Sequence, residues 1–111
     1  MQNKLDGLMD GINAFELKEL LKKEEKMLLL DVRNPDEFEA MRLGIGEVLI
    51  PLGQLRARLN ELPKDKDTLI VTWCKISLRG YEAALILKSY GYTNVKVLEG
   101  GLMAWPFGRE R

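Results

Sequence analysis

The sequence predicts an α/β fold in which a five-stranded, mainly parallel sheet is covered by helices on both faces. Short apolar runs typical of buried strands alternate along the chain with segments whose apolar residues recur at helical spacing. This order favours parallel strands joined by crossover helices. The 111 residues are 46% hydrophobic and 31% charged, which suits a single domain, residues 1–111, with one hydrophobic core.

The first strand is expected to begin near Ile12, at an edge of the sheet. Residues 1–11 are polar and contain glycine, so we expect a loosely held lead-in to a core at residues 12–105. Asn13 is a good N-cap for the helix that follows. The apolar face of this helix consists of Ala14, Leu17, Leu20 and Leu21.

The next buried strand is predicted at residues 27–33 and ends in charge. Residues 34–37, Asn-Pro-Asp-Glu, then predict a helix start, with the N3 glutamate reaching back to the N-cap. Phe38 and Met41 mark the inner face of this helix. Asp31 and Arg33 are predicted to pair with each other or with neighbouring strands. We expect a structural ion pair that supports the neighbouring site and not catalysis, because neither residue has a partner suited to proton transfer at neutral pH.

The second half of the chain continues the alternation. Residues 48–51 form a short strand, a helical stripe of leucines follows, and residues 63–67 make a charged turn into the uncharged central strand, residues 69–73. A helix is predicted at residues 80–90, and the last strand at residues 95–98. The leucine stripe consists of Leu52, Leu55, Leu59 and Leu62, and the close-packing face of the later helix of Gly80, Ala83, Ala84, Leu87 and Tyr90. Gly100 and Gly101 break the last strand before a short terminal helix.

Cys74, the only cysteine, directly follows the central strand. It therefore lies at the carboxyl end of the sheet, where folds of this class bind ligands. Backbone N–H groups of the loop and of the next helix favour an anion there. With Lys75 beside it and Arg79 closing the loop, the thiol is expected to ionise more readily than a free cysteine and to act as a nucleophile. The alternative is that Cys74 is a small buried hydrophobic residue.

Composition excludes several classes of function. Lys plus Arg and Asp plus Glu number 17 each, so we expect no nucleic-acid partner. The absence of histidine removes Cys–His catalysis and most transition-metal sites, so we expect no metal. Gly44 and Gly46 lack the third glycine and the preceding strand of a dinucleotide-binding fingerprint, and we expect no cofactor.

The sequence also indicates the cellular compartment in which we expect the protein. A single cysteine cannot form an intramolecular disulfide, and residues 1–7 lack the apolar core of a secretory signal. No apolar run approaches the roughly eighteen residues of a membrane span. These features predict a cytoplasmic protein with no membrane partner.

Four segments together carry a resemblance to a known family. They are Asp31-Val32-Arg33 with Glu37-Phe38, then Ile50-Pro51-Leu52, the loop from Cys74 to Arg79, and residues 98–105, Leu-Glu-Gly-Gly-Leu-Met-Ala-Trp. In order and spacing they resemble a rhodanese-like domain from about Ile12 to Trp105. The resemblance implies a three-layer fold and a Cys74 persulfide that carries sulfur from thiosulfate, a polysulfide or a persulfide to a thiol or cyanide. It also implies a substrate-binding loop made of Lys75, Ile76, Ser77, Leu78, Arg79 and Gly80.

The length of the cysteine loop distinguishes the sulfurtransferase members of this family from related enzymes. Four residues separate Cys74 from Arg79, as in sulfurtransferase members, whereas the related phosphatases and arsenate reductases have one more. Residues 78–83 are similar to rhodanese modules attached to flavin-dependent coenzyme A disulfide or polysulfide reductases. This similarity implies a flavin-dependent disulfide reductase as a candidate partner, although the chain has no flavin motif.

The chain departs from the family pattern at the loop. Ser77 stands where glycine is common, Gly80 where serine or threonine is common, and residues 42–44, Arg-Leu-Gly, where a Gly-His-Ile segment is common. The intact Cys74 and Arg79 favour an enzyme. The serine favours the alternative function, a rhodanese-like binding, regulatory or sulfur-carrier module with weak turnover.

Overall fold

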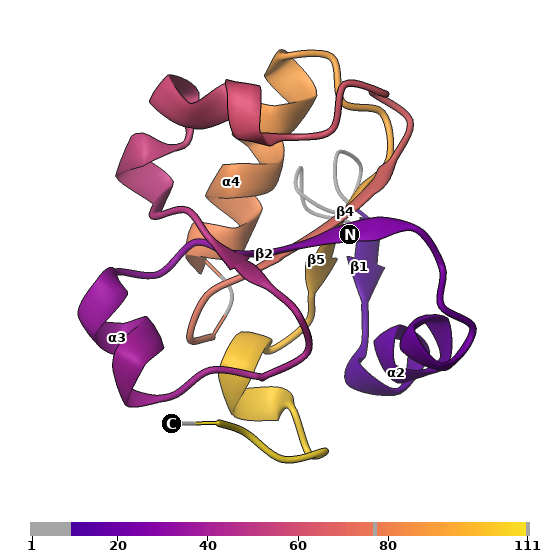
Figure 1. The fold of residues 1–111 in the computed structure, drawn as a ribbon, viewed down its shortest axis with the longest axis vertical. Coiled ribbons are helices and arrows are strands. Elements are labelled where there is room, and N and C mark those ends of the chain that lie inside the picture. The colour runs from indigo at the N-terminus through magenta and orange to yellow at the C-terminus, as the bar shows by residue number, and fades with distance from the viewer. Residues whose placement is uncertain (1–9, 77, 111) are drawn as a thin grey trace, which may run out of the picture.

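A computed structural model describes residues 10–76 and 78–110 of the chain. Its elements are a single five-stranded sheet in the order β1-β5-β4-β2-β3, every pairing of which is parallel, with helices around it (Figure 1). The strands are β1 (Asp10–Ile12), β2 (Met27–Asp31), β3 (Val48–Leu49), β4 (Leu69–Trp73) and β5 (Val95–Leu98). The helices are α2 (Ala14–Lys22), α3 (Pro35–Ala40) and α4 (Leu78–Ser89), with 3₁₀ segments η1 (Leu52–Gln54), η2 (Arg56–Glu61) and η3 (Gly101–Ala104).

Strand β4 is the centre of the sheet, because it pairs with β2 on one side and β5 on the other. Its register places Leu30 opposite Thr72 and Asp31 opposite Trp73 on the β2 side. Ile70 to Trp73 are completely buried. A strand buried on both faces needs an uncharged sequence, and Leu-Ile-Val-Thr-Trp supplies one.

Alternate side chains of the strands build two apolar clusters, one on each face of the sheet. Leu30 and Ile70 point into the cluster beneath α4, η1 and η2. Leu29 and Val71 point into the other cluster, beneath α2 and η3. The predicted sheet with helices on both faces is therefore confirmed.

The helix starts follow their local signals. Asn13 caps α2, accepting from the N–H of Glu16 at 2.8 Å while the Glu16 carboxylate accepts from the N–H of Asn13 at 2.9 Å. At α3, Pro35 occupies the first turn, and the N–H of Asn34 donates to the Glu37 carboxylate at 3.0 Å. Both predicted starts are confirmed.

Three expectations need correction at the level of elements. The leucine stripe forms two 3₁₀ segments with a kink at Arg58 and not one α-helix, because hydrogen bonds join residues three apart, such as Leu55 to Leu52. Helix α4 begins at Leu78, two residues before the expected Gly80, so Arg79 lies in its first turn. Strand β1 begins at Asp10, so the last two residues of the expected lead-in are paired with β5, while residues 1–9 lie outside the described residues.

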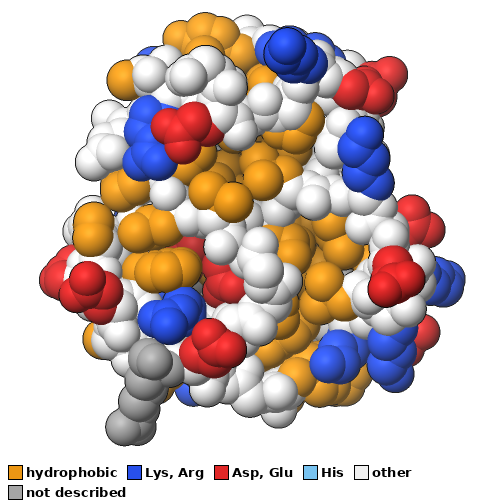
Figure 2. All heavy atoms as spheres, in the orientation of Figure 1, with side chains coloured by type: hydrophobic (Ala, Val, Ile, Leu, Met, Phe, Trp, Pro, Cys, Tyr) orange, Lys and Arg blue, Asp and Glu red, His pale blue; other side chains and the backbone are white. Residues whose placement is uncertain are grey.

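Charged side chains of both signs occur on the face of the molecule drawn in Figure 2. Figure 2 shows acidic and basic side chains interspersed over the visible face, with hydrophobic side chains between them. Within residues 10–76 and 78–110, no helix is long and apolar enough to cross a membrane.

Candidate active site

Cys74 lies between the end of β4 and the start of α4, at the carboxyl end of the central strand. The segment that carries it passes between α3 and η3 (Figure 1). The residue is buried, with 3% of its surface exposed, and packs in the cluster beneath α4. The thiol is therefore shielded from bulk water, although it lies at the rim of the sheet and not at its middle.

The start of α4 is held tightly against β4. The Thr72 hydroxyl donates to the Gly80 carbonyl at 2.9 Å. A Cβ atom on Gly80 would lie 3.2 Å from the Trp73 Cα, so only a glycine lets the helix approach this closely without a shift of the backbone. This contact brings the N-terminal turn of α4 next to Cys74.

Segment η3 holds the other side of the loop. The N–H of Leu102 donates to the Cys74 carbonyl at 2.9 Å, and the N–H of Met103 donates to the Lys75 carbonyl at 3.1 Å. Gly101 has φ +59°, and a Cβ there would lie 2.4 Å from the carbonyl oxygens of Cys74 and Ile76. The sequence predicted only that this glycine ends the last strand. The structure shows that the cysteine loop packs directly against it.

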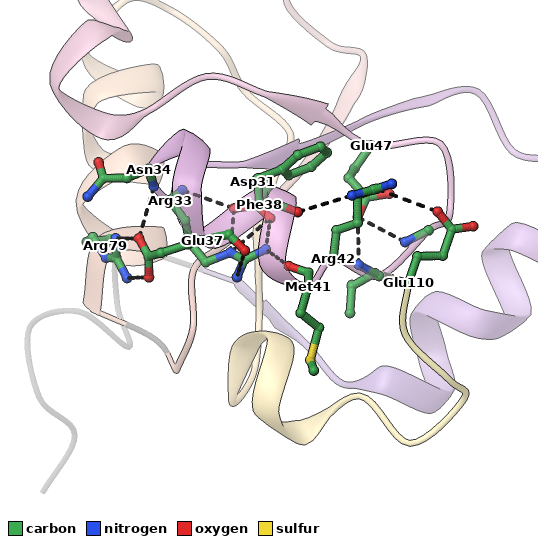
Figure 3. A network of polar contacts seen from close by, with 12 residues as sticks. Asp31, Arg33, Asn34, Glu37, Phe38, Met41, Arg42, Glu47, Arg79 and Glu110 are labelled. Carbon is green, nitrogen blue, oxygen red and sulfur yellow. Dashed lines mark hydrogen bonds and ion pairs between the residues drawn. The ribbon is translucent and has the colours of Figure 1, made fainter.

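Arg79 forms a bidentate ion pair with Glu37 of α3 (Figure 3). Its two terminal nitrogens lie 2.7 Å and 3.0 Å from the two carboxylate oxygens. The hydrogen bonds from Arg79, together with the N–H of Asn34 and the nearby charges of Arg79 and Arg33, lower the pKa of Glu37 to about 2 against the opposing effect of burial. Glu37 raises the pKa of Arg79 in turn, and the Cys74 thiol adds to that effect. The bidentate pair thus fixes the guanidinium of Arg79 as a cation in the first turn of the helix that follows Cys74.

A second ion pair joins Asp31 and Arg33 at the end of β2. Asp31 and Arg33 are buried, with 0% and 3% exposure, and their closest nitrogen and oxygen are 2.8 Å apart. Of the two predicted alternatives, the structure therefore shows the pairing of Asp31 with Arg33. Arg33 also donates to the main-chain carbonyls of Glu37 and Met41, at 3.4 Å and 2.6 Å (Figure 3). The pair fixes the end of β2 to α3 and so places Glu37.

A pocket of about 330 Å³ opens beside the cysteine loop, between α3 and η3. Its lining residues are Arg33, Glu37, Ala40, Met41, Lys75, Leu102 and Met103. A larger pocket of about 450 Å³ lies at the opposite end of the strands, beside Met27 and Pro63. The smaller pocket is the better candidate for the substrate, because it touches the loop that carries the thiol and the larger one does not.

The structure places three of the six predicted loop residues, Lys75, Arg79 and Gly80, around this site. Arg79 and Gly80 lie in the first turns of α4, one beside the thiol and one against β4. Lys75 lines the pocket, whereas Ile76 and Leu78 are 61% and 67% exposed. Ser77 lies outside the described residues. Within the described part of the chain, no group of three or more Cys, Asp or Glu side chains could hold a metal ion.

Sequence reasoning missed Glu37 as a site residue. The capping pattern of residues 34–37 already explains a glutamate at that position, and its partner is 42 residues away. The resemblance included Glu37-Phe38, but it did not indicate which side chain the glutamate binds.

Comparison with known proteins decides the family. The family model described as the rhodanese-like domain matches residues 13–106, which include every element just described except β1. The chain belongs to the rhodanese-like domain family. The predicted family and fold are thereby confirmed.

Several relatives of this rhodanese-like domain are named for sulfur chemistry. A sulfurtransferase from Allochromatium vinosum is 33% identical over 98 residues, which are 88% of this chain and 89% of that protein. A NAD-dependent persulfide reductase from A. fulgidus is 45% identical with a TM-score of 0.71, over 95% of this chain. CoADR-RHD from Bacillus anthracis is 37% identical with a TM-score of 0.77, over 90% of this chain. The rhodanese-like domain spans only 17% of the length of each of these two solved chains.

Proposed function

We propose that this rhodanese-like domain is a sulfurtransferase whose Cys74 carries a sulfane sulfur as a persulfide. The observation that supports this most directly is the position of the only cysteine, at the end of β4 beside an arginine that Glu37 holds in place. A family relative of nearly the same length is named as a sulfurtransferase. The proposal therefore assigns to this thiol the chemistry for which its relative is named.

The transfer has two steps. The Cys74 thiolate attacks the outer sulfur of a donor; with thiosulfate, the S–S bond breaks, its electron pair leaves with sulfite, and a new S–S bond joins the outer sulfur to Sγ. An acceptor thiolate or cyanide then attacks that outer sulfur, and the electron pair of the second broken bond returns to Sγ as thiolate. Charge and atoms balance at each step, and no metal or redox cofactor is required.

The surrounding groups stabilise the anions of both steps. Arg79 is a fixed cation next to the thiol, and Lys75 adds a second positive charge at the pocket. Helix α4, which has 12 residues, begins at this loop, so the positive end of its dipole faces the loop. Preorganised donors of this kind lower the barrier without having to reorient during the reaction.

The proposal is tested by steady-state sulfur transfer from thiosulfate and from cysteine persulfide to dithiothreitol or cyanide. Wild-type protein should transfer sulfur catalytically, and Cys74→Ser should lose the activity while keeping the melting temperature of the wild type. Equal rates for the two proteins would contradict the proposal.

A second candidate function has one observation in its favour. Only 3% of the Cys74 surface is exposed, which suits a binding or sulfur-carrier module that meets its partner protein before the thiol reacts. A flavin-dependent disulfide reductase is one candidate partner of this kind. The NAD-dependent persulfide reductase and CoADR-RHD support it, because each contains a segment of this fold within a much longer chain. A module of this kind would show slow transfer between small molecules and a stoichiometric gain of one sulfur from the partner.

A further inference from the structure

Two adjoining pockets lie at the amino ends of the strands, at the end of the sheet opposite to Cys74. The larger, of about 450 Å³, is formed where the chain enters β2 and β4. The smaller, of about 360 Å³, lies next to it, because Pro63 and Lys64 line both. The described residues that line the two pockets include none from the cysteine loop, so the proposed sulfur transfer does not use them.

Apolar surface is left open in these pockets, and part of it is held rigidly. Met27, Leu28 and Pro63 line the larger pocket and are only half-buried. In the smaller pocket the buried Tyr92 donates from its hydroxyl to the Pro63 carbonyl at 3.0 Å. The Lys66 ammonium lies 4.0 Å from the centroid of the Tyr92 ring, so an aromatic face and a cation are fixed side by side.

Positive charge predominates around this apolar surface. The charged residues of the two linings are three lysines and one carboxylate, namely Lys26, Lys64, Lys66 and Asp65. Within residues 10–76 and 78–110, neither Lys26 nor Lys64 has a carboxylate oxygen within 4.0 Å. The Asp65 carboxylate accepts instead from the N–H of Asp67, at 2.9 Å. The pockets therefore combine uncovered apolar groups with lysines that lack an anionic partner in the described chain.

We propose that these pockets bind a small organic carboxylate with an apolar chain, such as a medium-chain fatty acid. Lys64, which lines both pockets, pairs with the carboxylate, and the chain lies against Met27, Leu28 and Pro63. A volume of about 450 Å³ falls within the roughly 300–1,000 Å³ of ligand sites. The ligand needs both parts, because an exposed ion pair alone contributes little and burial of the chain supplies the larger share of the affinity. This site is separate from the proposed sulfur transfer and does not depend on it.

Isothermal titration calorimetry with octanoate tests the site. Acetate, which has the charge without the chain, and octylammonium, which has the chain with the opposite charge, are the ligand controls. Two charge reversals are compared with the wild type. Lys64→Glu changes the cation that both pockets share, and Lys18→Glu is the matched control, because it makes the same change of charge on α2 outside both linings. Melting curves confirm that each variant is folded, and amide chemical shifts of the wild type locate bound octanoate.

Octanoate should bind to the wild type at least about tenfold more tightly than acetate or octylammonium. Lys64→Glu should weaken octanoate binding by about five- to tenfold, and Lys18→Glu should leave it within about twofold. The largest amide shifts should fall in residues 26–28 and 62–68. Absent binding of octanoate, equal binding of octanoate and octylammonium, equal effects of the two reversals, or amide shifts centred on residues 73–80 would each overturn the inference.

Discussion

Arg79 is positioned by a carboxylate that precedes it by 42 residues, and this pairing is the main feature of the site at the scale of single residues. The sequence predicted that Cys74 and Arg79 follow an uncharged strand at the carboxyl end of the sheet, and the structure has both there. That Cys74 is the nucleophile stays a prediction. It did not predict Glu37 as the partner, because a local capping pattern already accounted for that residue. Long-range pairs of this kind depend on which helix packs beside the loop, and residue spacing does not specify that.

Replacing Arg79 should separate activity from stability. Arg79→Ala should lower sulfur loading of Cys74 by about tenfold or more, because a fixed cation next to the thiolate is lost. Arg79→Lys should recover only part of the loss, since an ammonium group cannot reproduce the bidentate contact with Glu37. Loading rates from either donor, measured beside melting curves, check this. Parallel losses of melting temperature and loading rate in both variants would make Arg79 a structural residue instead.

The Glu37 carboxylate should make stability depend on pH in the acid range. Its folded-state pKa is about 2 and its ordinary value is 4.5, so the ionised pair stabilises the fold fully above about pH 5. That stabilisation is lost as the pH falls through 4.5 toward 2, where the carboxylate becomes protonated in both states. Urea unfolding of the wild type and Glu37→Gln should therefore show a constant gap above about pH 5 that narrows in more acid solution. A gap that stays the same down to about pH 3 would contradict the pairing in solution.

Segment η3 supports the loop at the scale of elements. The sequence predicted a strand, a glycine break and a short terminal helix, and all three are present. It did not predict that the glycines place η3 against the carbonyls of Cys74, Lys75 and Ile76, because positive φ and close approach at Gly101 follow from packing. The same limit explains the leucine stripe, whose spacing fits an α-helix and a pair of 3₁₀ segments almost equally well.

Gly101→Ala tests the support given by η3. The added Cβ would lie 2.4 Å from two carbonyl oxygens of the loop, at a φ of +59°. We expect a loss of about 2 kcal/mol or more in the free energy of unfolding, together with a large loss of sulfur loading. Gly53→Ala is the matched control, because a Cβ there has nothing within 4 Å and its φ is not positive. Similar behaviour of the two variants would show that η3 does not bear on the loop.

The buried pair of Asp31 and Arg33 connects β2 with α3. Asp31→Asn should destabilise the fold by about 3 kcal/mol or more, because it leaves the buried Arg33 without its counter-charge. Glu61→Gln is the matched control, since its ion pair with Arg58 lies at the surface and should leave the melting temperature close to that of the wild type. Thermal unfolding followed by circular dichroism measures both. An equally small effect of Asp31→Asn would mean that the pair does not hold β2 to α3.

At the scale of the whole molecule, one sheet divides two apolar clusters. The alternation of strands and helices predicted this arrangement correctly, because a strand such as β4 has to be covered on both faces. The order of strands, with β4 in the centre, follows from the tertiary pairing and not from any single segment. That central place explains why the loop after β4 lies against η3 on one side and leads into α4, whose Arg79 pairs with Glu37 of α3.

Both clusters should unfold together if the chain is the single domain that the sequence predicts. Leu17→Ala on one face and Leu30→Ala on the other remove side chains with no exposed surface, and each should cost about 2–5 kcal/mol. Each variant should shift the whole unfolding transition, followed by far-ultraviolet circular dichroism and tryptophan fluorescence. Two separate transitions, only one of which responds to Leu17→Ala, would contradict a single cooperative unit.

The most direct test of the account is the mass of the intact protein before and after reaction with a sulfane donor. After incubation with cysteine persulfide, the wild type should gain one sulfur, about 32 Da, and lose it when an acceptor thiol is added. Cys74→Ser should gain no mass. The folded wild type should acquire the sulfur faster than the same protein unfolded in urea, because the groups around Cys74 accelerate the reaction beyond that of a free thiol. An absent gain, an equal gain in Cys74→Ser, or equal rates for folded and unfolded protein would contradict the assignment of Cys74 as the sulfur carrier.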